Sequence, residues 1–191
     1  MYKIESHVVM TTTEDYIENY VDVPKFLGYC KKCDSYGKNW SCPEFKFDAE
    51  GLWKKYKYVY IIGTKIIFDK DVINGFEDME VAKEQVQEAL WKEKKVLMEK
   101  LWKLEEDYPG AISLSAGSCK LCKTCQRQID KPCIHPNKMR HSIESIGGDV
   151  GKTLSQLLGI ELQWAKDGKL PEYYTLVSGL LTNKGDIAIE I

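Results

Sequence analysis

Seven cysteines occur in the chain, and they fall into two separate groups. The first cysteine group has the spacing Cys30-x2-Cys33-x8-Cys42. The second cysteine group has the spacing Cys119-x2-Cys122-x2-Cys125-x7-Cys133. Thiolate sulfurs at two-residue spacing are soft ligands that can surround one metal ion or one iron–sulfur cluster. Because no cysteine lies outside the two groups, the pattern indicates two metal-binding segments rather than scattered structural thiols.

The second cysteine group favours an iron–sulfur cluster. Its opening run, C-x2-C-x2-C, is also the opening run of bacterial ferredoxin motifs. Zinc needs four ligands and usually takes them from two separated pairs, so a third cysteine at this spacing is less natural for zinc. We therefore predict a [4Fe–4S] cluster on this group, with zinc as the alternative. Cys133 is the favoured fourth ligand, although Cys42, which precedes Pro43, is a second candidate.

The first cysteine group offers only three thiolates, and three interpretations remain open. It can hold a second [4Fe–4S] cluster whose remaining iron binds water, substrate or a non-cysteine side chain. It can hold zinc with a fourth ligand from elsewhere, or its cysteines can join those of the second group in a mixed site. An open metal position is one that can bind and polarise a substrate.

The function expected from both groups is that of an iron–sulfur protein with one or two [4Fe–4S] clusters and a redox or electron-transfer role. A redox enzyme that binds its substrate at the three-cysteine cluster is one form of this hypothesis. The alternative is a zinc-binding structural or interaction module without catalysis. The motifs for nucleotide hydrolysis and for dinucleotide binding are absent from the sequence.

Basic residues lie among and after the second cysteine group: Lys120, Lys123, Arg127, Lys131, Lys138 and Arg140. Cations near a thiolate-bound cluster would stabilise its reduced, more negative state. A solvated basic loop explains the same residues equally well. His135, two residues after Cys133, is a further candidate ligand for zinc or for the first group.

Composition limits the class of protein and its expected partners. The chain has 191 residues, of which 43% are hydrophobic, and a formal net charge of −2. This charge gives no reason to expect nucleic-acid binding. The first residues lack a secretory pattern and no apolar run is long enough for a membrane span, so we expect a cytoplasmic protein with reduced thiols. The expected partner is a redox protein or a small-molecule substrate, and nothing in the sequence indicates an oligomeric state.

The elements that position the cysteines can be predicted from apolar patterns. Strands are expected at 2–10, 57–68, 111–117, 160–165 and 173–182, and a last one at 186–191. Helices are expected at 14–20, 49–56, 78–106 and 142–158. The fold class is therefore α/β or α+β, as a single domain over residues 1–191. We expect one sheet with flanking helices and two cysteine-rich loops, at about 28–45 and 117–136, at the ends of the sheet.

Two blocks of sequence resemble a family of predicted metal-binding proteins, found mainly in anaerobic bacteria and archaea, that share a domain of unknown function. CKKCDSYGKNWSCPEF resembles its C-x2-C-x2-Y-G-x-x-W-x-C-P motif, and CKLCKTCQRQIDKPCIHPNKMRHSIESIGGDV is similar to its second motif. The resemblance implies metal or iron–sulfur binding by all seven cysteines. Five further residues match the second motif: Pro136, Ser142, Glu144, Gly147 and Asp149.

Overall fold

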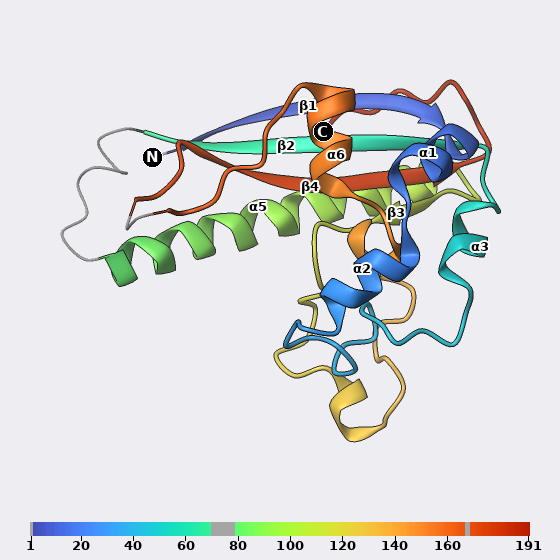
Figure 1. Ribbon diagram of the computed structural model, residues 1–191, viewed down its shortest axis with the longest axis horizontal. Helices are drawn as coiled ribbons and strands as arrows, with labels where there is room; N and C mark the ends of the chain where they lie inside the picture. Colours follow the sequence, from blue (N-terminus) through green and yellow to red (C-terminus); the bar gives the residue numbers. More distant parts are fainter. Residues whose placement is uncertain (1, 70–78, 167–168) are drawn as a thin grey trace.

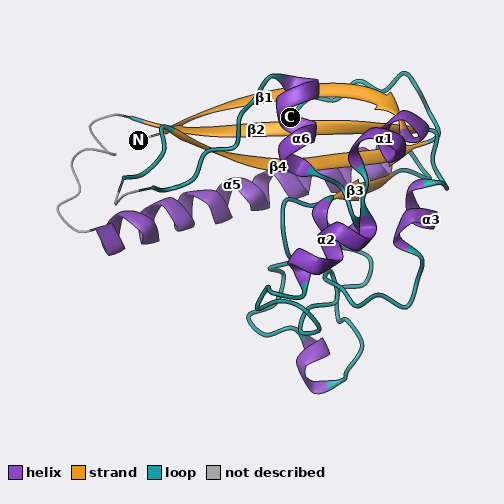
Figure 2. Cartoon of the chain, viewed as in Figure 1, coloured by secondary structure: helices purple, strands orange, loops and turns teal. Residues whose placement is uncertain are grey.

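The computed structural model describes residues 2–69, 79–166 and 169–191. Its centre is one four-stranded antiparallel sheet with the strand order β1-β2-β4-β3, flanked by helices (Figures 1 and 2). The strands are β1 (Tyr2–Thr12), β2 (Tyr58–Phe68), β3 (Ile112–Leu114) and β4 (Tyr173–Thr182). The antiparallel pairing makes the fold α+β, which confirms the predicted class of a sheet with flanking helices.

Strand β2 is a central strand, paired with β1 on one side and β4 on the other, and hydrophobic clusters cover both of its faces. Val59 and Ile61 contribute to the core on one face, whereas Tyr60 and Ile62 contribute to the core on the opposite face. This burial on both faces explains the nearly continuous run of β-branched and aromatic residues that made β2 the easiest strand to predict.

Helix α5 (Met79–Asp107) covers one face of the sheet. Its buried residues Leu97, Leu101 and Leu104 pack against Tyr60 of β2 and Leu180 of β4. The spacing of these leucines places them on one side of the helix, as the sequence pattern predicted. Within the described ranges, no helix is long and apolar enough to cross a membrane.

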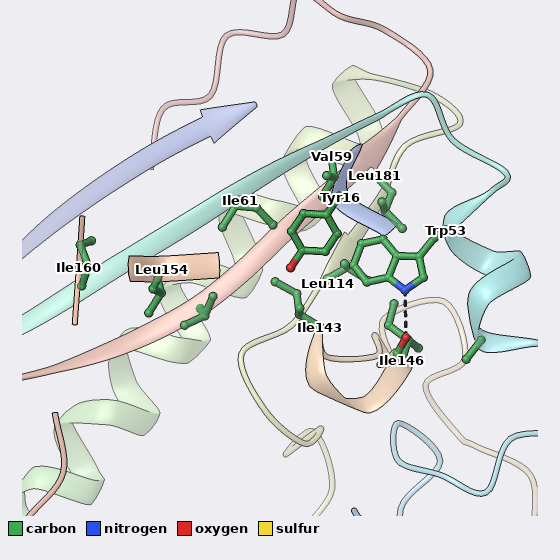
Figure 3. Packing of buried hydrophobic residues seen from close by; sticks show 12 residues of the cluster. Tyr16, Trp53, Val59, Ile61, Leu114, Ile143, Ile146, Leu154, Ile160 and Leu181 are labelled. Carbon is green, nitrogen blue, oxygen red and sulfur yellow. Dashed lines mark hydrogen bonds between the residues drawn. The ribbon is translucent and has the colours of Figure 1, made fainter. Parts of the chain in front are cut away.

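Short helices cover the other face. They are α1 (Thr13–Tyr20), α3 (Ala49–Trp53), the 3-10 helix η2 (Glu144–Ile146), α6 (Val150–Thr153) and the π-helical turn η3 (Leu154–Leu158). Figure 3 shows their core around Tyr16 and Trp53, both fully buried. The Trp53 Nε1–H donates a hydrogen bond of 2.9 Å to the carbonyl of Ile146, which ties α3 to η2.

Four sequence predictions are wrong in their details. Residues 142–158 do not form one helix, because Gly147 adopts a φ of +94° and ends the turn after Ile146. Residues 160–165 and 186–191 belong to no strand. Helix α2 (Val23–Cys30) lies where a loop was expected from residue 28, because Pro24 falls in its first turn, where a proline needs no hydrogen-bond partner.

Candidate metal site

Two cysteine segments, residues 30–42 and 119–133, lie together on the side of α2 that faces away from the strands (Figure 1). The first cysteine segment begins at Cys30, the last residue of α2, and continues as a series of turns. The second cysteine segment follows β3 and contains one 3-10 helix, η1 (Gln126–Ile129). The segments are therefore placed by α2 and by β3, which come from distant parts of the sequence.

Hydrogen bonds join the two cysteine segments directly. The Asn39 side chain donates from Nδ2 to the carbonyl of Cys119 at 2.9 Å. The backbone N–H of Cys119 donates to Ser41 Oγ, also at 2.9 Å. Ser41 Oγ in turn donates to Asn39 Oδ1 at 3.0 Å, so that one small network fixes the backbone at the first cysteine of the second segment.

Arg127 adds a second connection between the segments. Its Nη1 donates to the carbonyls of Asn39 and Cys42 at 3.0 and 2.7 Å, and its Nη2 donates to the carbonyl of Glu44 at 2.8 Å. Its guanidinium also lies 5.2 Å from the centre of the Trp40 ring. Because one guanidinium donates to three backbone carbonyls, it holds the first segment in a defined position against the second.

All seven thiols are free, and none lies in the hydrophobic core. Cys33 is exposed and the other six are half-buried. Burial raises the pKa of Cys30 to about 11, and burial also raises the pKa values of Cys42, Cys119 and Cys122. Without a metal these thiols are therefore protonated at neutral pH, and a metal must displace their protons.

The electrostatic neighbours of the thiols follow the two groups found in the sequence. After burial, the pKa of Cys30 is raised by Cys42 and Cys33. The pKa of Cys119 is likewise raised by Cys122 and Cys133, although hydrogen bonding and Lys94 oppose this. The fold thus places members of the same group within interaction range of one another.

Lys94 and Glu144 lie where the two cysteine segments meet. The Lys94 Nζ donates to the carbonyl of Ser118, the residue before the second segment. Burial lowers the pKa of Lys94, while Cys119, Glu144 and Cys42 oppose that shift. Burial raises the pKa of Glu144, and Lys94 is among the groups that oppose it. Lys94 therefore interacts with Glu144 and with thiols of both groups, whereas Glu144 interacts with Cys30 and Cys42 of the first group.

Glu144 reaches this junction because two glycines allow its turn to pack closely. A Cβ on Gly147 would lie 2.6 Å from Val23 Cγ2, and a Cβ on Gly148 would lie 2.4 Å from Ile143 Cγ2. The carbonyl of Gly147 accepts a 2.8 Å hydrogen bond from the N–H of Asp22, the residue that caps α2. A larger residue at position 147 would push the Glu144 turn away from α2, and one at position 148 would clash with Ile143 within the turn itself.

The chemistry of the donor set fits a metal that prefers sulfur, because seven free thiols lie in two neighbouring segments. Within residues 2–69, 79–166 and 169–191, however, no three side chains of His, Cys, Asp or Glu already form a metal-binding group. The thiols of each group would therefore have to converge when metal binds, which is expected where metal binding and local folding are coupled.

The histidines have different surroundings. His135 lines a pocket together with Cys119 and Cys122. His141 packs against the stacked rings of Phe45 and Phe47, with ring centroids 4.6 and 5.2 Å away, and its Nδ1 is 3.1 Å from the Ser41 carbonyl. His141 is thus part of the packing beneath the first segment.

A scan against family models matches residues 17–182 to a family described as predicted metal-binding protein (DUF2284). The chain belongs to this family. The match includes both cysteine segments and the Glu144 turn, and it confirms the family resemblance inferred from the two sequence motifs. No curated protein and no solved structure matches the chain in the corresponding searches. Membership in DUF2284 supports metal binding and leaves the kind of metal to be inferred from the residues.

Sequence reasoning identified the cysteines but missed the residues that hold their segments in place. Asn39 and Ser41 stand inside the first motif without a recognisable spacing, and Lys94 looked like one of many solvated lysines of a long helix. Arg127 was noted only as part of a basic loop. The Glu144 match to the family motif was the one available signal for that residue.

Proposed function

We propose that this DUF2284 protein is an iron–sulfur protein with a redox or electron-transfer role. One [4Fe–4S] cluster would be held by the second cysteine group and a second cluster by the first group. The ligands would be Cys119, Cys122, Cys125 and Cys133 for the former, and Cys30, Cys33 and Cys42 for the latter. The observation that carries this proposal is the docking of two segments that contain all seven free thiols.

A bound cluster would supply one-electron transfer and, at an iron without a thiolate ligand, a position that can bind a substrate. The surrounding residues suit such a group. The half-buried positions of six thiols would limit contact with water. Lys94 and Arg127 place positive charge beside thiols of both groups, which offsets the negative charge that thiolates bring.

Glu144 is a candidate for the fourth position of the first group, because its turn packs against α2, the helix that ends at Cys30. Its charge acts on both Cys30 and Cys42. A carboxylate is a weaker ligand for iron than a thiolate and is more easily displaced by a substrate. We therefore propose that Glu144 is the fourth ligand of the first site in the resting protein. Of the ligands left open by the sequence (water, substrate or a non-cysteine side chain), this proposal chooses the side chain.

The test is the content of iron, acid-labile sulfide and zinc in protein purified without oxygen. About eight irons per chain support two clusters, and about four support one. Cys122→Ser and Cys33→Ser form a matched pair, because each removes one proposed ligand from a different group. Each is expected to remove about half of the iron, and loss of all iron in both variants would contradict two independent sites.

Zinc is the second candidate, favoured by His135, which lines the same pocket as Cys119 and Cys122. A Cys/His set at that position is typical of structural zinc sites. If oxygen-free protein contains zinc and neither iron nor sulfide, the iron–sulfur proposal is wrong. A His135→Ala variant that then loses its zinc would favour a zinc-stabilised interaction module.

A further inference from the structure

A pocket of about 780 Å³ lies between α5 and the second cysteine segment. Pockets that bind small molecules in proteins commonly measure about 300–1,000 Å³. One wall comes from α5, where Trp91, Lys95, Met98 and Trp102 recur at three- and four-residue spacing and so share one side of the helix. The opposite wall comes from residues 119–123 and from His135, Lys138 and Arg140, and it includes the proposed metal ligands Cys119 and Cys122.

The pocket is strongly positive, although the chain as a whole has a net charge of −2. Its basic lining residues are Lys94, Lys95, Lys120, Lys123, Lys138 and Arg140, and its acidic one is Glu99. Arg140 is paired with Glu105 outside the pocket lining. In the described part of the chain, Lys95, Lys120, Lys123 and Lys138 form no salt bridge. Four exposed ammonium groups are thus available to an anion.

Two tryptophans give the same pocket flat apolar surfaces. Trp91 is 54% exposed, which leaves a large, flat aromatic surface open to water. Trp102 is half-buried, and its buried indole N–H has no hydrogen-bond partner within the described residues. Lys138 Nζ lies 5.2 Å from the centre of the Trp102 ring, so cationic and aromatic groups are interleaved.

We propose that this pocket binds a small molecule that combines a planar ring with phosphate or carboxylate groups. The ring would contact Trp91 and Trp102, and the anionic groups would bind the four exposed lysines. The concave shape favours a small molecule over a long polyanion, which would need a charged stripe that extends beyond the pocket. This inference goes beyond metal binding, since the contacts it invokes involve no thiol.

The experiment is isothermal titration calorimetry on protein purified without oxygen, with its native metal content. The probes are flavin mononucleotide and AMP, each of which joins a planar ring to a phosphate. Riboflavin and adenosine are their uncharged counterparts. We expect saturable binding of at least one phosphorylated probe, at least 10-fold weaker binding of its uncharged counterpart, and weaker binding as ionic strength rises.

Variants then locate the binding site. The double variant Lys95→Gln/Lys138→Gln should weaken binding of the phosphorylated probe about 10-fold. The matched control, Lys92→Gln/Lys100→Gln, removes the same charge from residues of α5 outside the pocket lining and should leave affinity unchanged. Trp91→Ala should weaken binding of the phosphorylated probe but not of inorganic phosphate. All of these side chains are exposed, so the variants should retain the wild-type melting temperature.

Three outcomes would overturn the proposal. One is the absence of saturable binding for both phosphorylated probes. Another is equal weakening by the pocket and control double variants, which would indicate a general charge effect. The third is binding of a single-stranded oligonucleotide without binding of either mononucleotide, which would identify the surface as one for nucleic acid.

Discussion

Replacing Arg127 with Gln is predicted to separate the two cysteine segments while the sheet stays folded. Arg127 makes three charge-assisted hydrogen bonds, each worth about 1.5–3 kcal/mol when fully effective. Two of them share one nitrogen, and the guanidinium is only half-buried, so we expect a total of about 2–4 kcal/mol after discounting for solvent. Local opening should therefore become about 30- to 700-fold more frequent.

The assay is the alkylation rate of Cys42 in reduced, metal-free protein, followed by mass spectrometry. Burial raises the pKa of Cys42, and the charge of Arg127 opposes that shift. Loss of this charge alone would therefore raise the pKa further and slow alkylation. A faster reaction in the variant thus reports opening of the segment and cannot come from the change in charge.

Lys131→Gln is the matched control, because it removes an exposed cation from the same segment. The contact that Trp40 makes to residue 131 uses the backbone carbonyl and survives this substitution. Arg127→Lys keeps the charge but loses the planar fork, so it should resemble Arg127→Gln more than the wild type. Equal alkylation rates in Arg127→Gln and Lys131→Gln would refute the argument that Arg127 holds the segments together.

Three further predictions concern stability and metal affinity. Burial alone would raise the pKa of Glu105, but hydrogen bonds, chiefly from Arg140, outweigh it and lower the pKa. Glu105→Gln should lower the free energy of unfolding in urea by about 2–4 kcal/mol at pH 7. This difference in stability from wild type should decrease below pH 4.5, the ordinary pKa of the carboxyl group, as the wild-type carboxylate becomes protonated. Gly147→Ala should lower the free energy of unfolding by at least about 2 kcal/mol, because the new Cβ would lie 2.6 Å from Val23 of α2. Gly159→Ala should lower it by only about 1 kcal/mol, because Gly159 has a φ of +63° but no atom within 4 Å of the new Cβ. Because the pKa of Cys30 is raised to about 11, zinc or cobalt affinity measured by competition with a chelator should increase as pH rises from 6 to 8; a constant affinity would contradict proton displacement.

The sheet was predictable where burial leaves a local pattern in the sequence. Strand β2 is apolar on both faces, and α5 repeats its leucines at helical spacing. Residues 160–165 carry a similar alternation, yet Trp164 is 75% exposed, and no strand among the described residues pairs with this segment. A local pattern shows what a segment could bury but not whether a partner is present.

The candidate site was predictable in its ligands but not in its support. The cysteines can be recognised from residue type and spacing, because closely spaced thiols are typical of metal-binding sites. The bonds from Asn39 to Cys119 and from Arg127 to Cys42 connect residues about 80 positions apart through side chain and carbonyl. Such contacts leave no periodic signal, since they depend on backbone carbonyls that only the fold brings together.

The second cysteine segment is held at its base by bonds that involve no thiol. The N–H of Ser115 donates to the carbonyl of His141 at 2.8 Å, and Glu105 binds both Ser113 and Arg140. The ends of the loop between these points are brought together without the thiols. The entropic cost of closing the loop is therefore met by the fold and does not oppose metal binding. Metal binding then needs only local convergence of side chains on turns. This division explains how residues 119–133 can lie close to their partners and still lack a ready-made ligand group within the described structure.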